Sequence, residues 1–371
     1  MPSPRTLDLD ALLAPISEDA PAGVDLRSDP QVSKRYYALK DARGSARSLE
    51  RNNLAEEGES ADMRGEWAPV LDQACELISH HSKDLEVTAW LIEALARLKG
   101  FPGLRDGFVL TQGLVKQYWD DIYPRPDEDG VETTVAPLAG LNGADSEGTL
   151  INPVRNIPIT QGESGPFAAW HYEQASALEQ LPADKRGARI ESGAVTTDTL
   201  RRAAQQTPAS FFVGLSEDLK EAQAALKSLS DLLDEKAGTD APSTAKIRNA
   251  FDSCALAIQF LGGDKIEAAL TRTEGDAHGG SADATGGQDG TSGRARGAGP
   301  VRTREDAFRA LLEIAEFFRQ TEPHSPLSYG IEQVVRWGRT PLPDLLKILI
   351  LDNDAREQLC RLTGIPSPGD G

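Results

Sequence analysis

Hydrophobic residues recur every three or four positions between residues 63 and 122. This spacing places them on one face of an α-helix. The Gly100-Phe101-Pro102-Gly103 run interrupts the pattern, and a proline-rich stretch at 123–130 ends it. Short connections favour antiparallel neighbours, so the pattern predicts helices of a bundle, closed by a further apolar turn at 135–141.

The flanking segments also favour helices. Asp29-Pro30 is typical of a helix start, and we expect that helix to run to about Arg51. Residues 149–166 mix β-branched residues with prolines and are expected to be extended, whereas 167–178 have a helical pattern. The fold class that follows is all-α.

A second long helical region begins near residue 197. Thr207-Pro208 is typical of an N-cap followed by proline at the first helical position. Apolar stripes run along both sides of the turn at 240–243. Together they predict an αα-hairpin in a helical middle region, residues 181–270.

The composition changes abruptly at residues 271–303. Nine glycines lie among Ser, Thr, Asp and Ala, without a large apolar residue before Val301. Such a sequence is typical of a flexible linker. It separates the body from a C-terminal segment, 304–371, which opens with a capping-box-like Thr303-Arg304-Glu305-Asp306.

The C-terminal segment contains the most apolar stretch of the chain. Its prolines and N-cap residues predict two short helices, at about 326–339 and 341–351. The second is hydrophobic on nearly every side, and such a helix must be buried. A region this small buries such a surface with difficulty, so it either self-associates or folds over its own core. The pattern leaves both open.

The composition of the chain limits the classes of function that it can have. The formal charge of −19 and the pI near 4.7 argue against a nucleic-acid partner. Residues 1–270 hold 27 basic and 43 acidic groups, whereas 304–371 hold 8 and 11, as suits a self-associating tail. Three cysteines without a CxxC motif, no signal-peptide pattern and no long apolar run predict a cytoplasmic protein that does not insert into a membrane.

Motifs of catalysis and cofactor binding are missing from the sequence. It contains no GxxxxGK[ST], GxGxxG, GxSxG or HExxH pattern, so we expect no enzyme, no cofactor and no metal site. Asp120, Asp121, Asp127, Glu128 and Asp129 leave a carboxylate-dependent hydrolase as an alternative, although a solvated loop is the simpler interpretation.

Two stretches resemble a known family. Ile16 to Arg27 (ISEDAPAGVDLR), followed by Asp29-Pro30, resembles the opening of the ImpA N-terminal domain. Tyr118 to Pro124 (YWDDIYP), the acidic loop after it and Leu138-Ala139-Gly140-Leu141-Asn142-Gly143 resemble its middle. This domain defines the TssA proteins of bacterial type VI secretion systems. The resemblance covers about residues 8–180, and EPHSPLSYGIEQVVRWGRTPLPDLLKILI is similar to the tail of short TssA proteins.

The resemblance implies a non-enzymatic assembly factor. Proteins of this family associate with baseplate and membrane-complex proteins and help to coordinate assembly of tube and sheath. Their C-terminal regions build rings, from which N-terminal domains project. The domain division expected here is therefore an ImpA-like domain at 1–180, the middle region, the linker, and an oligomerisation domain at 304–371.

Two sets of residues are the candidate contacts. A Trp flanked by Arg is typical of interface hot spots, and apolar residues follow it. The candidate homo-oligomer interface comprises Arg336, Trp337, Arg339, Leu345, Leu346, Ile348 and Leu349. Glu322 or Glu332 of a neighbouring subunit would pair with the arginines, whereas the plainer interpretation is that Trp337 fills its own core. The candidate partner-binding residues of the arm are Trp119, Tyr123 and Asp127. A monomeric acidic regulatory module is the remaining alternative.

Overall fold

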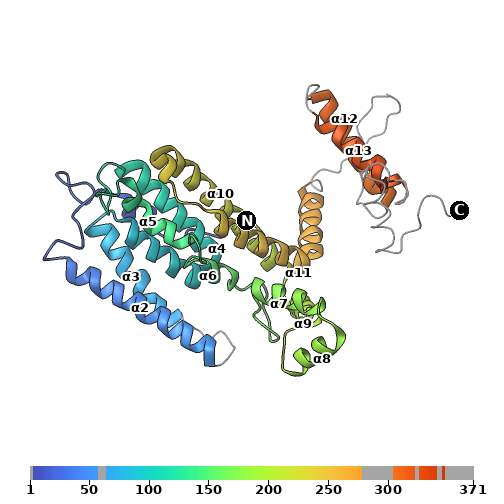
Figure 1. Ribbon diagram of the computed structural model, residues 1–371, viewed down its shortest axis with the longest axis horizontal. Coiled ribbons are helices and arrows are strands. Elements are labelled where there is room, and N and C mark those ends of the chain that lie inside the picture. The colour runs from blue at the N-terminus through green and yellow to red at the C-terminus, as the bar shows by residue number, and fades with distance from the viewer. Residues whose placement is uncertain (1–2, 57–63, 278–303, 322–325, 341–344, 347–371) are drawn as a thin grey trace, which may run out of the picture. The chain divides into compact units, whose positions relative to one another are not determined.

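The computed structural model describes residues 3–56, 64–277, 304–321, 326–340, 345 and 346. Its regular elements within these ranges are helices, which confirms the all-α prediction. The chain divides into two compact units, Met1–Ala282 and Asp283–Gly371. The helices of the first unit are coloured blue to orange in Figure 1 and those of the second red.

The first unit contains α1 to α11. The bounds are α1 Leu9–Leu13, α2 Ser33–Glu56, α3 Arg64–His80, α4 Leu85–Tyr118, α5 Val131–Asn142, α6 Ile151–Arg155, α7 Ala169–Glu179, α8 Ala183–Glu191, α9 Thr197–Gln206, α10 Ala209–Ala237, the 3-10 turn η1 Gly238–Asp240 and α11 Ala245–Ala277.

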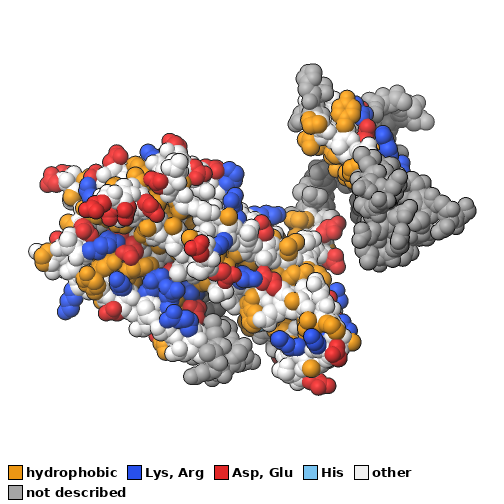
Figure 2. All heavy atoms as spheres, viewed as in Figure 1, with side chains coloured by type: hydrophobic (Ala, Val, Ile, Leu, Met, Phe, Trp, Pro, Cys, Tyr) orange, Lys and Arg blue, Asp and Glu red, His pale blue; other side chains and the backbone are white. Residues whose placement is uncertain are grey.

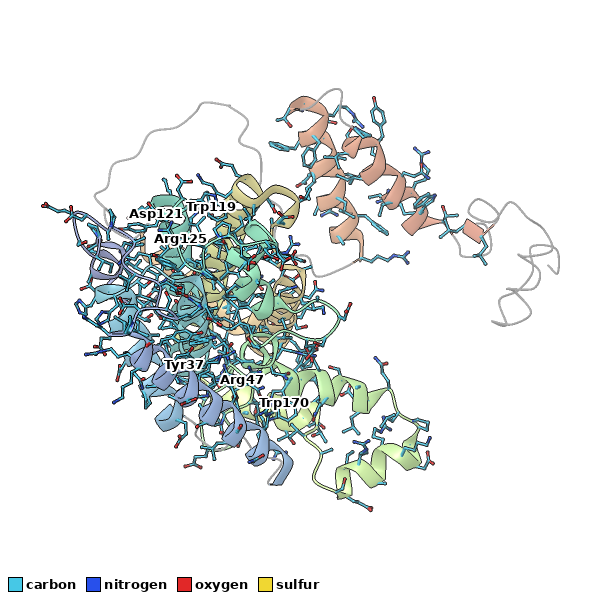
Figure 3. The ribbon with its side chains drawn as sticks, turned by 60° about the vertical axis from the view of Figure 1, so that its left-hand side comes forward. Tyr37, Arg47, Trp119, Asp121, Arg125 and Trp170 are labelled. Atoms are coloured by element: carbon cyan, nitrogen blue, oxygen red, sulfur yellow. The ribbon has the colours of Figure 1, made fainter. Side chains whose placement is uncertain are left out.

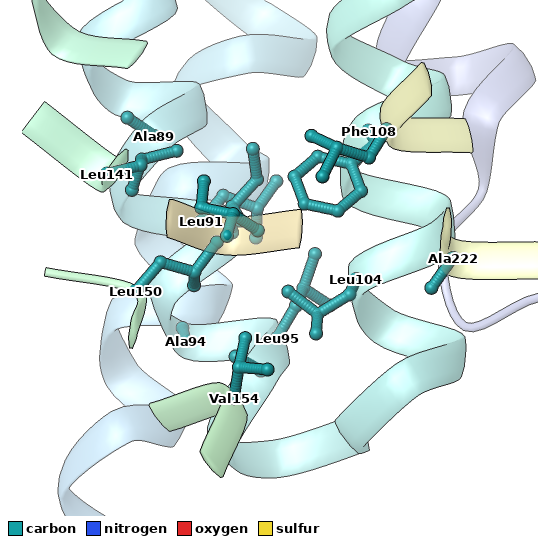
Figure 4. Close-up of a cluster of buried hydrophobic side chains, with 14 of the residues drawn as sticks. Ala89, Leu91, Ala94, Leu95, Leu104, Phe108, Leu141, Leu150, Val154 and Ala222 are labelled. Atoms are coloured by element: carbon teal, nitrogen blue, oxygen red, sulfur yellow. The ribbon is translucent and has the colours of Figure 1, made fainter. Parts of the chain in front are cut away.

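Helix α4 is the centre of this unit. It packs against α3 on one side and α10 on another, and also contacts α1, α5 and α6. Its Leu91, Leu95, Leu104 and Phe108 are buried beside Leu141, Leu150, Val154 and Ala222 of neighbouring segments (Figure 4). The predicted break is present as a kink, because Gly100 has a φ of 62° and a ψ of −139°. Only glycine adopts such a backbone readily.

The predicted αα-hairpin is α10 and α11. The stripes Leu219, Ala222, Leu226, Leu229 and Leu233 of α10 and Ile247, Phe251, Cys254, Ile258 and Leu261 of α11 are buried. They join the same hydrophobic cluster as α3 and α4, and Phe251 packs edge-on against Phe101 and Phe108 of α4. The hairpin therefore shares a core with the residues that precede position 180.

Several local predictions were wrong. Helix α2 begins at Ser33 rather than at Pro30 and continues to Glu56 rather than ending near Arg51. Within the stretch expected to be extended, residues 151–155 form α6, whose Ile151 and Val154 pack into the core. Helix α11 continues to Ala277, so the start of the predicted linker is helical. Helix α8 lies in the middle region that was predicted to be helical, although no periodic stripe marked it.

Thr207 does not cap α10 as predicted. Its hydroxyl donates toward the carbonyl oxygens of Ala203 and Gln161, and accepts a hydrogen bond from the Gln161 amide. The hydroxyl therefore ties the end of α9 to the segment that follows α6. The N-cap of α10 is Pro208, which supplies no side-chain hydrogen bond to the helix.

The second unit contains α12, Arg304–Thr321, and α13, Leu327–Arg339, which pack against each other. Helix α13 confirms the first of the two predicted C-terminal helices. Of the second, predicted at 341–351, only residues 345 and 346 lie within the described ranges. Most of the predicted linker, 278–303, is also outside them.

We predict that Phe251→Ala destabilises the first unit by about 3–5 kcal/mol, because it removes a buried aromatic ring from between α4 and α11. Leu256→Ala, on the exposed side of the same helix, should change the stability by less than about 0.5 kcal/mol. Denaturant unfolding followed by fluorescence and circular dichroism measures both. A shared core requires the whole unit to shift in one transition; an early transition confined to the hairpin would contradict it.

Candidate functional site

The two stretches that carry the family resemblance meet in space at the start of α4. Residue 82 forms an isolated bridge with Gly23, and Asp84 forms one with Tyr123. The amide of Lys83 donates to the carbonyl of Ala22, and the amide of Leu85 donates to the carbonyl of Tyr123. We call the meeting point of segments 16–30, 82–86 and 118–130 the junction.

Asp84 is the central side chain of the junction. It is fully buried and caps α4, accepting hydrogen bonds from the amides of Glu86 and Val87. The guanidinium of Arg27 lies 2.7 Å from its other carboxylate oxygen. A buried carboxylate is stable when hydrogen bonds and an opposite charge satisfy it, and Asp84 has both.

Arg27 connects Asp84 to α2. Its other nitrogen pairs with Glu86 at 2.5 Å, and its guanidinium lies 5.1 Å from the centre of the Tyr36 ring. The Tyr36 hydroxyl donates to Glu86 at 2.7 Å. Burial lowers the pKa of Arg27, but the charges of Asp84 and Glu86 outweigh it and raise that pKa overall. Burial, together with the bond to Glu86, raises the pKa of Tyr36.

Gly23 lets the first segment approach α3 closely. Its φ is +77°, and a Cβ atom there would overlap the carbonyl oxygen of His81. The amide of Val24 donates to that same carbonyl oxygen at 3.1 Å. The glycine is therefore required both by the backbone conformation and by this contact.

The predicted arm residues lie beside the junction. Trp119 is half-buried against the core and Tyr123 is half-buried, whereas Asp127 is exposed. Arg125 covers the Tyr123 ring at 5.0 Å and pairs with Asp121 at 3.1 Å. In Figure 3, Trp119, Asp121 and Arg125 lie together at one end of the bundle. The three predicted residues follow one another along a single segment that the structure places at the junction, with two of them half-buried.

Asp127 organises its own loop. It accepts hydrogen bonds from the amide of Asp129 at 3.0 Å and from the hydroxyl of Thr133. These two bonds, the Thr133 bond first, lower the pKa of Asp127. Its carboxylate is thus committed to the turn that leads into α5.

The carboxylates of the hydrolase alternative are dispersed. Asp120, Asp121, Asp127, Glu128 and Asp129 are all exposed. No cluster of three His, Cys, Asp or Glu residues suited to a metal ion occurs in the described part of the chain. Burial raises the pKa of Cys75 to about 11 and that of Cys254 to about 12, so both stay protonated thiols at neutral pH. The site geometry does not favour acid–base or nucleophilic chemistry here.

The predicted interface residues of the C-terminal unit are only partly described. Arg336 and Arg339 are exposed, and Trp337, Leu345 and Leu346 are half-buried, while Ile348 and Leu349 lie outside the described residues. Arg339 lies over the Phe308 ring of α12 at 5.4 Å. Glu332 pairs with Arg319 of its own chain, so the structure gives it a partner other than the predicted arginines, and Glu322 is outside the described residues.

Comparison with known proteins now identifies the chain. The family model for ImpA, N-terminal, type VI secretion system, matches residues 13–143. The type VI secretion system component TssA1 of Pseudomonas aeruginosa is 25% identical over 366 residues, covering 96% of this chain and 98% of the relative. A solved structure of the N-terminal domain, including the conserved ImpA_N region, of TssA from Burkholderia cenocepacia is 30% identical. That match has a TM-score of 0.57 and covers 70% of this chain and 97% of the domain.

The chain belongs to the TssA family. The resemblance stated from the sequence is confirmed. The stretch that matches the ImpA model contains all three segments of the junction, so this TssA protein builds its most recognisable motifs into one place. No helix in its described residues is long and apolar enough to cross a membrane.

Arg27 and Asp84 were not among the predicted site residues of this TssA protein. A sequence signal existed for Asp84, because Asp directly before an apolar helical pattern is a common N-cap. No local signal could identify Arg27 as its partner, since 57 positions separate the two residues.

We predict that Asp84→Asn destabilises the first unit by about 2 kcal/mol or more. The amide can still cap α4, but it leaves the half-buried Arg27 without its fully buried counter-charge. Asp121→Asn removes the exposed pair with Arg125 and should cost less than about 0.5 kcal/mol. Chemical denaturation of both variants measures the difference; equal, small effects would show that the Arg27–Asp84 pair does not hold the junction.

Proposed function

We propose that this TssA-family protein is a non-enzymatic scaffold of a type VI secretion system. In this proposal the C-terminal region, 304–371, forms a homo-oligomeric ring, and the ImpA-like domain, 1–180, with the middle region, 181–270, forms an arm that binds other components. The remainder of the predicted linker, 278–303, lets several arms act at once, so that weak contacts add up. The protein would act in the bacterial cytoplasm, beside the membrane-bound secretion complex, and coordinate assembly of tube and sheath.

The exposed apolar side chains of α12 and α13 are the observation that carries the ring. Phe317 is 60% exposed and Tyr329 65% exposed, and Leu312, Ile314, Leu327 and Val334 are also exposed. By contrast, Ala315, Ser328 and Val335 are the buried residues in the described part of this unit. An apolar surface of this extent on so small a unit supports association with further copies.

Arg336, Trp337 and Arg339 remain the polar part of the proposed interface. The Trp337 indole nitrogen is buried without an acceptor among the described residues. Arg339 and Arg304 flank the Phe308 ring, at 5.4 and 5.3 Å from its centre. This stack supports an inner role for Arg339, in which it holds α12 on α13, and leaves the exposed Arg336 as the arginine available to a neighbouring subunit.

We predict that the full-length protein has a mass several times 39.9 kDa by size-exclusion chromatography with light scattering. Removal of residues 278–371 should leave a monomer.

Phe317→Asp should lower the mass of the full-length protein, because it places a charge on an apolar contact, whereas Leu270→Asp, at an exposed position of α11, should not. A monomeric full-length protein would instead support the acidic regulatory module. Unchanged mass in Trp337→Ala and in Arg336→Ala with Arg339→Ala would assign that cluster to internal packing.

We also predict that Trp119→Ala reduces recovery of baseplate and sheath proteins with the tagged full-length protein at least tenfold, because buried aromatic anchors dominate interface energies. Tyr37→Ala, which removes a half-exposed aromatic ring from α2, is the matched control and should leave recovery unchanged. Light scattering must show the same mass for both variants. Equal recovery with Trp119→Ala at unchanged thermal stability would remove Trp119 from the proposed arm contact.

A further inference from the structure

A pocket opens between α2, α4, α6 and α7 of the first unit, away from the junction. Its volume is about 530 Å³, enough for a few side chains rather than for a folded domain. Arg47 of α2 and Trp170 of α7 both line it and are labelled in Figure 3. The other charged lining residues are Glu50, Arg51, Arg97, Glu147, Arg155 and Glu173.

The glutamates around this pocket are already paired. Glu50 accepts two hydrogen bonds from Arg97, and Glu173 pairs with Arg155. Glu93, buried behind the pocket, pairs with Arg43 at 2.6 Å and accepts a hydrogen bond from Thr149 at 2.7 Å. These carboxylates are therefore each paired with an arginine, although the second carboxylate oxygen of Glu93 is buried without a hydrogen-bond partner among the described residues.

Arg47 is left in excess. It has no hydrogen bond or ion pair with any residue that the structure describes, although it is only half-exposed. Burial lowers the pKa of Arg47, and although Glu93 opposes this, the positive charges of Arg43, Arg97 and Arg51 lower it further. Burial is thus the main cause that destabilises the charge of Arg47, the neighbouring guanidinium groups add to it, and an added anion would offset both.

The same side of the molecule is locally basic. Helix α2 carries six basic and three acidic residues in a chain of net charge −19. Figure 2 shows Lys and Arg side chains gathered over α2. An acidic partner is repelled by most of this protein, so a basic pocket gives it one favourable place to bind.

Trp170 gives the pocket an apolar wall. Its ring lies 4.0 Å, centre to centre, from that of His171. His171 accepts a hydrogen bond from the Ala168 amide, and burial lowers its pKa to about 4. The imidazole is therefore neutral at pH 7, and the wall contributes apolar surface rather than charge.

We propose that this pocket binds a short acidic segment of a partner protein, with a carboxylate on Arg47 and an apolar side chain against Trp170. The planar guanidinium fork matches a carboxylate bidentately. A segment, rather than a domain, fits the volume. This inference rests on the proposed function, since a scaffold works through other proteins, and it assigns them a second contact besides the junction.

The test measures binding of a fluorescein-labelled peptide of alternating glutamate and leucine to the full-length protein by fluorescence anisotropy. Binding should weaken as salt is added, and the same peptide with glutamine in place of glutamate should bind at least tenfold more weakly. Arg47→Gln and Arg47→Glu should each weaken binding about tenfold or more. Arg202→Gln and Arg202→Glu, at an exposed position of α9, are the matched controls and should leave binding unchanged.

Several outcomes would overturn the proposal. These are no binding, equal binding of the glutamine peptide, equal losses in the Arg47 and Arg202 variants, and displacement of the peptide by inorganic phosphate at the peptide's own concentration. Residues 57–62 contain Glu57, Glu59 and Asp62. A tenfold gain in peptide affinity on neutralising these three would show that the chain occupies its own pocket, which also contradicts a partner segment.

Two further measurements separate this proposal from the scaffold. Thermal unfolding of Arg47→Gln must match that of the unaltered protein, so that lost binding reflects the pocket and not the fold. Its mass by light scattering should also be unchanged. If the peptide does not bind but the protein is still an oligomer, the proposed peptide-binding pocket is rejected and the proposed ring is not. If the full-length protein is a monomer, the proposed ring is rejected, and the peptide measurement alone decides whether the pocket binds an acidic segment.

Discussion

The buried carboxylate of Asp84 is the constraint on which the N-terminal unit depends. It caps the central helix α4 and holds the guanidinium of Arg27, while the backbone on either side of it binds residues 22 and 123. A buried charge is costly unless all its bonds are made. The arrangement therefore holds three distant segments together, the first through Arg27 and the third through backbone hydrogen bonds of Tyr123 with Lys83 and Leu85.

The central helix then sets the extent of the core. Its kink at Gly100 separates a first half, whose Arg97 lies over Trp67 of α3, from a second half, whose Arg105 pairs with Glu221 of α10. Phe101 and Phe108 follow the kink, and Phe251 of α11 packs against both. For this reason the middle region completes the core of the ImpA-like domain. The boundary near residue 180 marks a change in the sequence pattern, but the residues on its two sides pack into one core.

Sequence periodicity was sufficient where a helix buries one regular stripe. It predicted α3, α4, α5, α7, α10, α11, α12 and α13, because each depends on spacing or a capping pattern that is visible within the element. It failed where a distant contact decides the local structure. Helix α6 forms because Ile151 and Val154 reach the core, and the Thr207 hydroxyl bonds to Gln161 instead of capping. The Arg27–Asp84 pair also depends on residues that are distant in the sequence, so periodicity could not predict it. The charge of Arg47, unpaired among the described residues, could not be predicted either, because it is recognised only when the partners of the neighbouring arginines are known.

The two units handle apolar and charged groups in opposite ways. The N-terminal unit buries nearly all of its large apolar stripes, so what distinguishes its surface is the local pairing or excess of charge, as at Arg27 and Arg47. The described helices of the C-terminal unit expose Phe317 and Tyr329 instead. Apolar surface gains most from contacts that are permanent, whereas charged sites give selective contacts that salt and partner charge can modulate. The proposed assembly through α12 and α13, with exchangeable contacts on the proposed arm, would use each surface in the way its chemistry favours.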